Sequence, residues 1–247
     1  EEIVAMIMRH VKELADKQSQ RVIKDVVVTI PPWWGFQERY ALHDALVIAG
    51  LNPLAFVHEN TAAALYYALE RQDNQTHTAM FYNLGSGSLK VSIIEFELVN
   101  STEKGDKNRY ESLRVISEAW DETVGGLTFD VNLAKYLAKQ FDELPQRKGK
   151  KSILSSNPAI AKLIKESNKL KETLSANKIV QFYAESIFES TDLKLNMERS
   201  KFEELNAEVF AKLTKPIDEA LRKAGKTIND IDAFEILGGA VRIPTVQ

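Results

Sequence analysis

The sequence predicts an α/β fold, in which short apolar strands alternate with amphipathic helices. Besides the alternation itself, two features carry this prediction. One is a continuous β-branched run at residues 26–30, and the other is a pair of apolar strands that each end in a glycine turn, at 85–88 and at 238–239. The 247 residues, of which 44% are apolar and 27% charged, are enough for one large domain or two smaller lobes.

Each expected element follows from a local pattern. Apolar residues that recur on one face predict helices at 3–14, 37–49, 61–69, 128–144, 158–174 and 200–213. Short apolar runs predict strands at 26–30, 54–57, 79–84, 89–98, 113–120 and 231–237. Polar composition predicts surface loops at 100–108 and 145–156.

Local signals support several of these elements. The β-branched run 26–30 is typical of a strand covered on both faces, and Gly50 stands where a C-cap glycine would end the preceding helix. Pro158 suits the first turn of a long helix. Ser200 and Glu203 have the spacing of a capping box, which predicts the start of the last helix before the final strand.

The two glycine turns are the strongest functional signal in the chain. Gly85-Ser86-Gly87-Ser88 joins two apolar strands, and Gly238-Gly239 follows the last strand. Glycine adds no Cβ, so a polyanion can approach the backbone and several N–H groups can converge on phosphate oxygens. The first turn alone could equally be a tight hairpin, but two such turns predict a nucleotide held between them.

Composition and charge argue against several other classes of protein. A net charge of −3 gives no general attraction to nucleic acid, and the basic segment 147–151 is expected to be a solvated loop. No apolar run reaches the roughly 18 residues that a membrane span needs, and no signal peptide is expected. The chain has no cysteine, and its four histidines lack ligand spacing, so no metal site is assigned.

Several short motifs keep one order along the chain. They are Val27-Val28-Thr29-Ile30-Pro31, Ile48-Ala49-Gly50-Leu51-Asn52, Glu59-Asn60-Thr61-Ala62-Ala63-Ala64, Leu84-Gly85-Ser86-Gly87, Val124-Gly125-Gly126, Phe202-Glu203-Glu204-Leu205-Asn206 and Leu237-Gly238-Gly239-Ala240-Val241-Arg242-Ile243-Pro244. Together they resemble the nucleotide-binding domain of the heat shock protein 70 superfamily of chaperones. This resemblance implies an actin-like (ribonuclease H-like) fold with two lobes. Within the superfamily the chain looks most like the endoplasmic-reticulum, hypoxia up-regulated (170-kilodalton glucose-regulated) branch, with the cytosolic 110-kilodalton branch as the alternative.

The resemblance also implies a division of the chain. Residues 1–73 correspond to the later part of the first lobe's base, and 74–123 with 198–247 to the base of the second lobe, which holds both glycine turns. Residues 124–197 correspond to an outer helical subdomain of the second lobe. The sequence begins without methionine and inside a helical pattern, so it is expected to be a fragment, with the first phosphate loop upstream and the client-binding domain downstream.

The resemblance implies roles for particular residues around ATP or ADP, with Mg²⁺ held through the nucleotide. Glu59 matches the carboxylate near the attacking water, although by itself it is an ordinary carboxylate at a helix start. The positions expected to contact the nucleotide are Gly85, Ser86, Gly87, Ser88, Gly125, Gly126, Lys171, Ser175, Gly238, Gly239 and Arg242. Without the resemblance, Lys171 and Ser175 would be read as a solvated helix face.

Several positions depart from the family pattern. Asn83 replaces an aspartate that serves the metal and the attacking water, and a neutral amide attracts hydrated magnesium weakly and cannot act as a base. Lys90 replaces a carboxylate that helps to bind potassium. Glu172 replaces an arginine that stacks on adenine, and Ala240 replaces a serine. These changes, with the glycine turns retained, predict nucleotide binding with weak hydrolysis or none.

The preferred functional prediction is therefore an ATP-binding domain of an endoplasmic-reticulum chaperone that assists the folding of unfolded client proteins. It would also act in nucleotide exchange on a lumenal chaperone of the same superfamily. The acceptor sequons at Asn74 and Asn100 agree with a lumenal location, and the cytoplasm is the alternative. The alternative function is an active ATPase that drives substrate-binding cycles. A sugar kinase of the same fold is more remote, because no carboxylate is identifiable as a base for a sugar hydroxyl.

Overall fold

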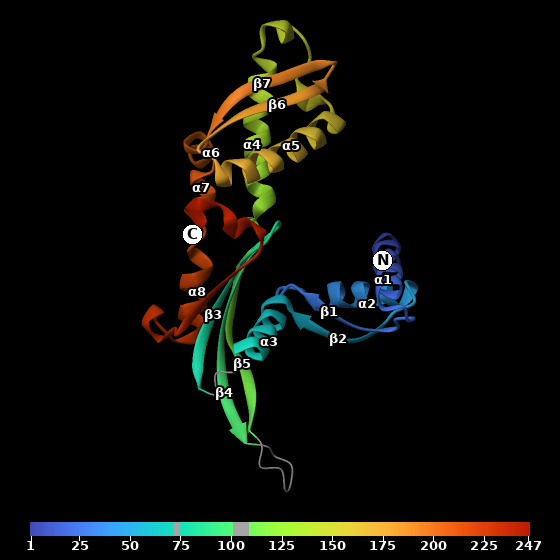
Figure 1. Cartoon of the computed structure of the whole chain (residues 1–247), viewed down its shortest axis with the longest axis vertical. Coiled ribbons are helices and arrows are strands. Elements are labelled where there is room, and N and C mark those ends of the chain that lie inside the picture. The colour runs from blue at the N-terminus through green and yellow to red at the C-terminus, as the bar shows by residue number, and fades with distance from the viewer. Residues whose placement is uncertain (72–74, 101–108) are drawn as a thin grey trace. The chain divides into compact units, whose positions relative to one another are not determined.

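The computed structural model describes residues 1–71, 75–100 and 109–247 and shows a mixed α/β chain with three sheets. Two compact units are present (Figure 1): the first comprises Glu1–Thr76 with Phe96–Val115, and the second His77–Glu95 with Ile116–Gln247. Most of the expected loop at 100–108, the sequon residue Asn74 and the side chain of Asn100 lie outside the described residues. No described helix is long and apolar enough to cross a bilayer.

The first unit contains a parallel pair of strands with helices packed against it. Its elements are α1 (Glu2–Ser19), β1 (Asp25–Ile30), α2 (Phe36–Ile48), β2 (Asn52–His58) and α3 (Glu59–Arg71). A small core forms where Ile30 of β1 meets Leu42 and Leu46 of α2. Gly50 follows the C-cap of α2 with φ 79°, a left-handed conformation that glycine adopts without strain.

The prediction that strand 26–30 is covered on both faces is wrong for this structure. Exposed and partly buried residues alternate along β1, Val27 is 60% exposed, and only Ile30 is fully buried. Leu54, which was expected in a buried strand, is 63% exposed in β2. In the described residues β1 pairs only with β2, so both strands are edges of a two-stranded sheet. A run of β-branched residues indicates a preference for an extended backbone, whereas the burial of a strand depends on the elements that pack against it.

A four-stranded sheet has the order β5-β4-β3-β8, and β3, β8, the part of β4 up to Glu95 and the part of β5 from Ile116 belong to the second unit. Its strands are β3 (His77–Leu84), β4 (Leu89–Asn100), β5 (Arg109–Asp121) and β8 (Ala233–Leu237). β3 and β8 run parallel, and Asn83 lies opposite Leu237. Parallel strands end at the same edge of a sheet, so this pairing brings the two glycine turns, which follow β3 and β8, together although they are far apart in the sequence.

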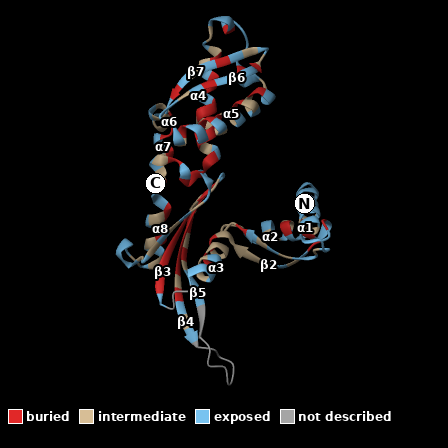
Figure 2. Ribbon diagram, in the orientation of Figure 1, coloured by how far each residue is buried: buried red, intermediate tan, exposed pale blue. Residues whose placement is uncertain are grey.

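Helices and a hairpin complete the second unit. They are α4 (Gly126–Asp142), α5 (Asn157–Ala176), β6 (Ile179–Phe188), β7 (Thr191–Glu198), α6 (Arg199–Leu205), α7 (Ala207–Phe210) and α8 (Lys215–Ala224). Short 3₁₀ helices occur at η1 (Pro145–Arg147), η2 (Ile153–Ser155), η3 (Ile228–Asp230), η4 (Gly239–Arg242) and η5 (Pro244–Val246). Figure 2 shows buried residues concentrated on the sheet strands and on α4 and α5.

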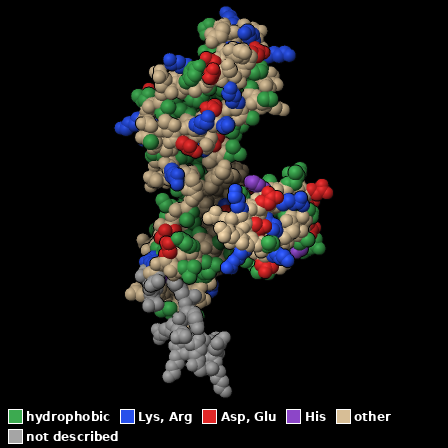
Figure 3. Space-filling model, turned by 45° about the vertical axis from the view of Figure 1, so that its right-hand side comes forward, with side chains coloured by type: hydrophobic (Ala, Val, Ile, Leu, Met, Phe, Trp, Pro, Cys, Tyr) green, Lys and Arg blue, Asp and Glu red, His purple; other side chains and the backbone are tan. Residues whose placement is uncertain are grey.

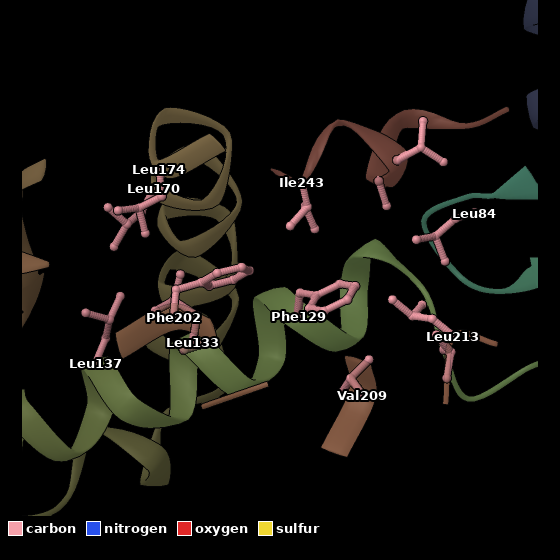
Figure 4. Close-up of a cluster of buried hydrophobic side chains, with 14 of the residues drawn as sticks. Leu84, Phe129, Leu133, Leu137, Leu170, Leu174, Phe202, Val209, Leu213 and Ile243 are labelled. Atoms are coloured by element: carbon pink, nitrogen blue, oxygen red, sulfur yellow. The ribbon is translucent and has the colours of Figure 1, made fainter. Parts of the chain in front are cut away.

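One apolar core connects the sheet to these helices. Phe129 of α4 is fully buried, and its ring lies 5.2 Å from that of Phe210 and 6.0 Å from that of Phe202. Leu84 at the end of β3 and Ile243 beside η4 belong to the same cluster (Figure 4). The core therefore anchors the end of β3 and the segment that follows β8.

Three sequence predictions in this unit need correction. The region 124–197, expected to be helical, also contains the antiparallel hairpin β6–β7, whose alternating pattern was not recognised. The expected helix 200–213 begins at Arg199 with Glu198 as its N-cap, and it breaks at Asn206. The capping box is absent there, because Glu203 accepts a hydrogen bond from Thr245 instead. A hydrogen bond to a residue distant in the sequence thus takes the place of the expected local one.

The basic segment 147–151 is also not simply a solvated loop. Arg147 is 2% exposed, and its guanidinium lies 5.0 Å from the ring centroids of both Phe141 and Phe188. It also donates hydrogen bonds to Glu189 and to the backbone carbonyl of Lys151. This arginine therefore fixes the segment after α4 to the β6–β7 hairpin. On the face drawn in Figure 3, basic (blue) and acidic (red) side chains are interspersed.

Candidate functional site

The two predicted glycine turns are in direct contact. A Cβ at Gly238 would lie 2.2 Å from the carbonyl oxygen of Leu84, the residue just before the first turn, and 3.1 Å from Oδ1 of Asn83. Gly238 also has φ 93° and ψ 158°, a backbone conformation that is essentially restricted to glycine. The parallel pairing of β3 with β8 places this glycine against the end of β3, so no side chain fits between the turns.

A third glycine segment packs on the first turn. The amide of Gly126 donates to the carbonyl of Gly85 (2.9 Å), and the amide of Leu127 donates to that of Ser86 (2.7 Å). A Cβ at Gly125 would lie 2.4 Å from the same Ser86 carbonyl oxygen. The start of α4 is therefore held against the turn between β3 and β4 by backbone contacts that require glycine at 125.

These segments surround one pocket of about 420 Å³. Its lining residues are Gly85, Ser86, Gly126, Asn168, Lys171, Glu172, Ser175, Gly239, Ala240, Arg242 and Ile243. Figure 1 shows the elements that supply them, with the red C-terminal segment lying between the ends of the sheet strands and α4. All of them belong to the second unit, and seven were predicted from sequence as nucleotide-binding positions. The volume is within the range of small-molecule sites.

Lys171 has a partner that sequence reasoning did not identify. Its ammonium lies 2.8 Å and 2.9 Å from the two carboxylate oxygens of Asp130 on α4, and it donates to the carbonyl of Gly126 at 3.2 Å. Both side chains are about nine-tenths buried. Burial raises the pKa of Asp130, while the hydrogen bond and charge of Lys171 act to lower it. The pair therefore joins α5 to the start of α4 beside the pocket, which Lys171 lines.

The remaining pocket residues come from one face of α5 and from the segment after β8. Ser175 donates its hydroxyl to the carbonyl of Lys171 (3.0 Å), and Arg199 caps the end of α5 through the carbonyls of Leu174 and Ser175. Asn168 was missed from sequence. Its position, one helical turn before Lys171 and Glu172, could have indicated that it shares their face.

Comparison with known proteins places the chain in a family. A family model described as Hsp70 protein matches residues 1–247. The chain belongs to the heat shock protein 70 family. It is 36% identical to mouse hypoxia up-regulated protein 1 over 252 residues, which cover 100% of this chain and 25% of the mouse protein. The Xenopus laevis protein of that name is 33% identical over 250 residues, covering 100% of this chain and 38% of the relative. Heat shock 70 kDa protein 17 of Arabidopsis thaliana is 32% identical over 248 residues, which cover 100% of this chain and 28% of the relative.

The resemblance drawn from the sequence motifs is thus confirmed, including the similarity to hypoxia up-regulated proteins. The chain spans only about a quarter to two fifths of the length of these relatives. Of the four positions expected to depart from the family pattern, Glu172 and Ala240 line the pocket. Asn83, a half-buried residue of β3, and Lys90, a buried residue of β4, are not among its lining residues.

Other expected positions do not line the pocket. Gly87 and Ser88 complete the first turn without lining the pocket, and the Ser88 carbonyl accepts a hydrogen bond from the amide of Gly85 (3.0 Å). Glu59 is the first residue of α3 and belongs to the first unit, so its expected role near the attacking water stays a prediction. Among the described residues, no group of three or more acidic or histidine side chains could bind a metal ion by itself.

Proposed function

We propose that this chain is part of an ATP-binding domain with the actin-like, two-lobed arrangement of the heat shock protein 70 family. The main support for this proposal is that three glycine segments converge on one pocket, which is lined on its other side by α5. ATP or ADP fits this arrangement. The glycine segments at 85–86, 126 and 239 would receive the phosphates, and the nucleoside would lie against α5 and Arg242. Magnesium would be held through the phosphates.

The charge of the pocket argues against fast catalysis. Lys171 is paired with Asp130, and a carboxylate, Glu172, lines the pocket together with Arg242, so little free positive charge is available to neutralise the phosphates. Phosphoryl transfer requires neutralisation of the phosphates and an oriented water molecule. Asn83 offers an amide where a carboxylate would serve both needs. We therefore propose that the domain binds ATP and hydrolyses it slowly or not at all.

A single charge at the first turn tests the proposed binding mode. Ser86 lines the pocket and is exposed, so Ser86→Glu should leave folding intact while it places a carboxylate beside the phosphates. We expect the dissociation constant of ATP to rise about thirtyfold in titration calorimetry with the full-length protein. Ser155→Glu, at an exposed position outside the pocket, is the matched control and should bind as the unmodified protein does. Equal binding by both variants would contradict a phosphate site at this turn.

The proposed slow hydrolysis and the alternative, an active ATPase, predict different effects of restoring a carboxylate at position 83. We expect Asn83→Asp to increase the single-turnover rate of ATP hydrolysis by the full-length protein about tenfold or more, because aspartate can hold hydrated magnesium and orient water. Rapid quench of radiolabelled ATP measures this rate. Brisk turnover by the unmodified protein, with no gain in the variant, would instead favour the alternative function, an active chaperone ATPase.

We further propose that the full-length protein is a chaperone of the endoplasmic reticulum, since its relatives include proteins named hypoxia up-regulated. Its partners would be unfolded client proteins and a lumenal chaperone of the same family, on which it promotes nucleotide exchange. Bound nucleotide would stabilise the conformation that the partner recognises, so exchange depends on differential affinity for that conformation. Release of labelled ADP from such a partner, with and without this protein, measures the activity directly.

A further inference from the structure

Two side chains on α5 form a hydrogen-bonded pair that lines the pocket. Nδ2 of Asn168 donates to Oε1 of Glu172 at 3.0 Å. An ionised carboxylate only accepts hydrogen bonds, so the amide nitrogen must face it, and Oδ1 of Asn168 is left as an acceptor. Oε2 of Glu172 is a second acceptor. The α5 side of the pocket therefore offers hydrogen-bond acceptors and a negative charge.

The glycine side of the pocket carries no carboxylate among its lining residues. It offers backbone surface free of side chains at Gly85, Gly126 and Gly239, whereas the one lysine of the pocket is held by Asp130 and the carbonyl of Gly126. A carboxylate a few ångströms from a phosphate repels it, because both groups are negatively charged. Phosphates would consequently occupy the glycine side, and the uncharged nucleoside would face Glu172.

We propose that Glu172, oriented by Asn168, determines specificity by accepting a hydrogen bond from a donor group of the nucleoside. Two groups have this chemistry: the exocyclic amine of the base and a ribose hydroxyl. A site built to pair with a donor rejects an analogue that lacks it, because the acceptor then loses its water without replacement. This inference rests on the proposed function, since it names what distinguishes the preferred nucleotide at the same pocket.

The test compares ratios of dissociation constants measured by competition on the full-length protein. ATP is compared with ITP, which lacks the amine, and with 2′-deoxy-ATP and 3′-deoxy-ATP, each of which lacks one hydroxyl. We expect the unmodified protein to prefer ATP over at least one analogue by about tenfold, the typical effect of a hydrogen bond to a charged group. In Glu172→Ala this preference should fall to within about twofold. The analogue whose ratio collapses identifies the donor.

The ratios distinguish recognition of a nucleoside donor by Glu172 from a general effect of its negative charge on affinity. All four ligands carry the same triphosphate, so the loss of the carboxylate charge shifts their affinities together and leaves the ratios unchanged. Glu166→Ala is the matched control, because Glu166 is a carboxylate on the same helix that pairs with Lys169 outside the pocket lining. It should keep the selectivity of the unmodified protein. Asn168→Ala should reduce the selectivity partly, since Glu172 then keeps its acceptors but loses its orientation.

The possible failures are distinguishable. If ATP binds but the unmodified protein shows no preference among the four nucleotides, the inference is overturned. The same holds if the preference survives in Glu172→Ala, or if Glu166→Ala abolishes it equally. If the unmodified protein binds none of the nucleotides, the proposed function itself is wrong.

Discussion

Replacing Gly238 with alanine is expected to lower the free energy of unfolding by about 4 kcal/mol. The residue has φ 93° and ψ 158°, a region that costs an L-residue roughly 1–3 kcal/mol. The added methyl group would also lie 2.2 Å from the carbonyl oxygen of Leu84, so β3 and β8 would have to separate, and such overpacking costs about 1–3 kcal/mol more. Urea unfolding followed by circular dichroism measures the loss.

The neighbouring glycine supplies the control. A Cβ at Gly239 meets no atom within 4 Å, so Gly239→Ala should change the free energy of unfolding by less than about 1 kcal/mol. Equal destabilisation by the two substitutions would show that loss of glycine flexibility, and not contact with Leu84, is responsible. In Gly238→Ala we also expect weaker ATP binding, because the two turns could no longer keep their contact.

Replacing Lys171 with methionine should lower the free energy of unfolding by about 3 kcal/mol at neutral pH. Methionine keeps the length and apolar stem of lysine but leaves the Asp130 carboxylate buried without a cation. Breaking a buried ion pair from one side costs about 3–5 kcal/mol, because the remaining charge has lost both its partner and its water. Denaturant unfolding at a series of pH values measures this cost.

The loss should depend on pH in a definite direction. Burial already raises the pKa of Asp130 above its ordinary value, and removal of Lys171 takes away the strongest opposing influence, so the pKa rises further. The folded variant then holds a proton that the unfolded chain releases. Stability from this group is therefore present at acid pH and is lost as pH rises through the folded pKa. The difference in stability between the variant and the unmodified protein should therefore shrink as pH falls below neutrality.

Two comparisons isolate the ion pair. Lys169→Met removes a lysine from the exposed side of α5, where it pairs with Glu166, and should cost at most about 0.5 kcal/mol. The double variant Asp130→Asn with Lys171→Met should recover most of the stability lost in Lys171→Met, because no uncompensated charge remains. A deficit that is constant with pH and persists in the double variant would mean that lost packing is the cause.

The sequence contained the signals for most of the candidate site. Gly85 and Gly239 belong to glycine turns, which are local patterns, whereas Gly126, Lys171 and Ser175 are expected at the site only because of the family resemblance. Asn168 and Asp130 were not identified. Asp130 resembles any polar residue of an amphipathic helix, and its role depends on a lysine about forty residues away that only folding brings within 3 Å.

Fold prediction failed where partners outside the segment decide the structure. The strand at 26–30 was correctly placed but is not covered on both faces, because its sheet has two strands in the described residues. The capping box predicted at Ser200 does not form, and Glu203 accepts a hydrogen bond from Thr245 instead. Arg147 was expected in solvent, yet two phenylalanine rings from separate elements enclose it.

By itself, the sequence determined the α/β class, the positions of most elements and the glycine segments, since backbone preference and periodicity are properties of neighbouring residues. It also carried the family membership, through motifs whose order needs no structure to read. Only the tertiary structure decided that the glycine turns touch, that Lys171 is neutralised and that Glu172 faces a pocket with Asn168 as its partner. The contact between the turns and the Lys171–Asp130 pair join segments distant in the chain, and the pocket that Glu172 faces is lined by such segments, so neighbouring residues cannot encode them.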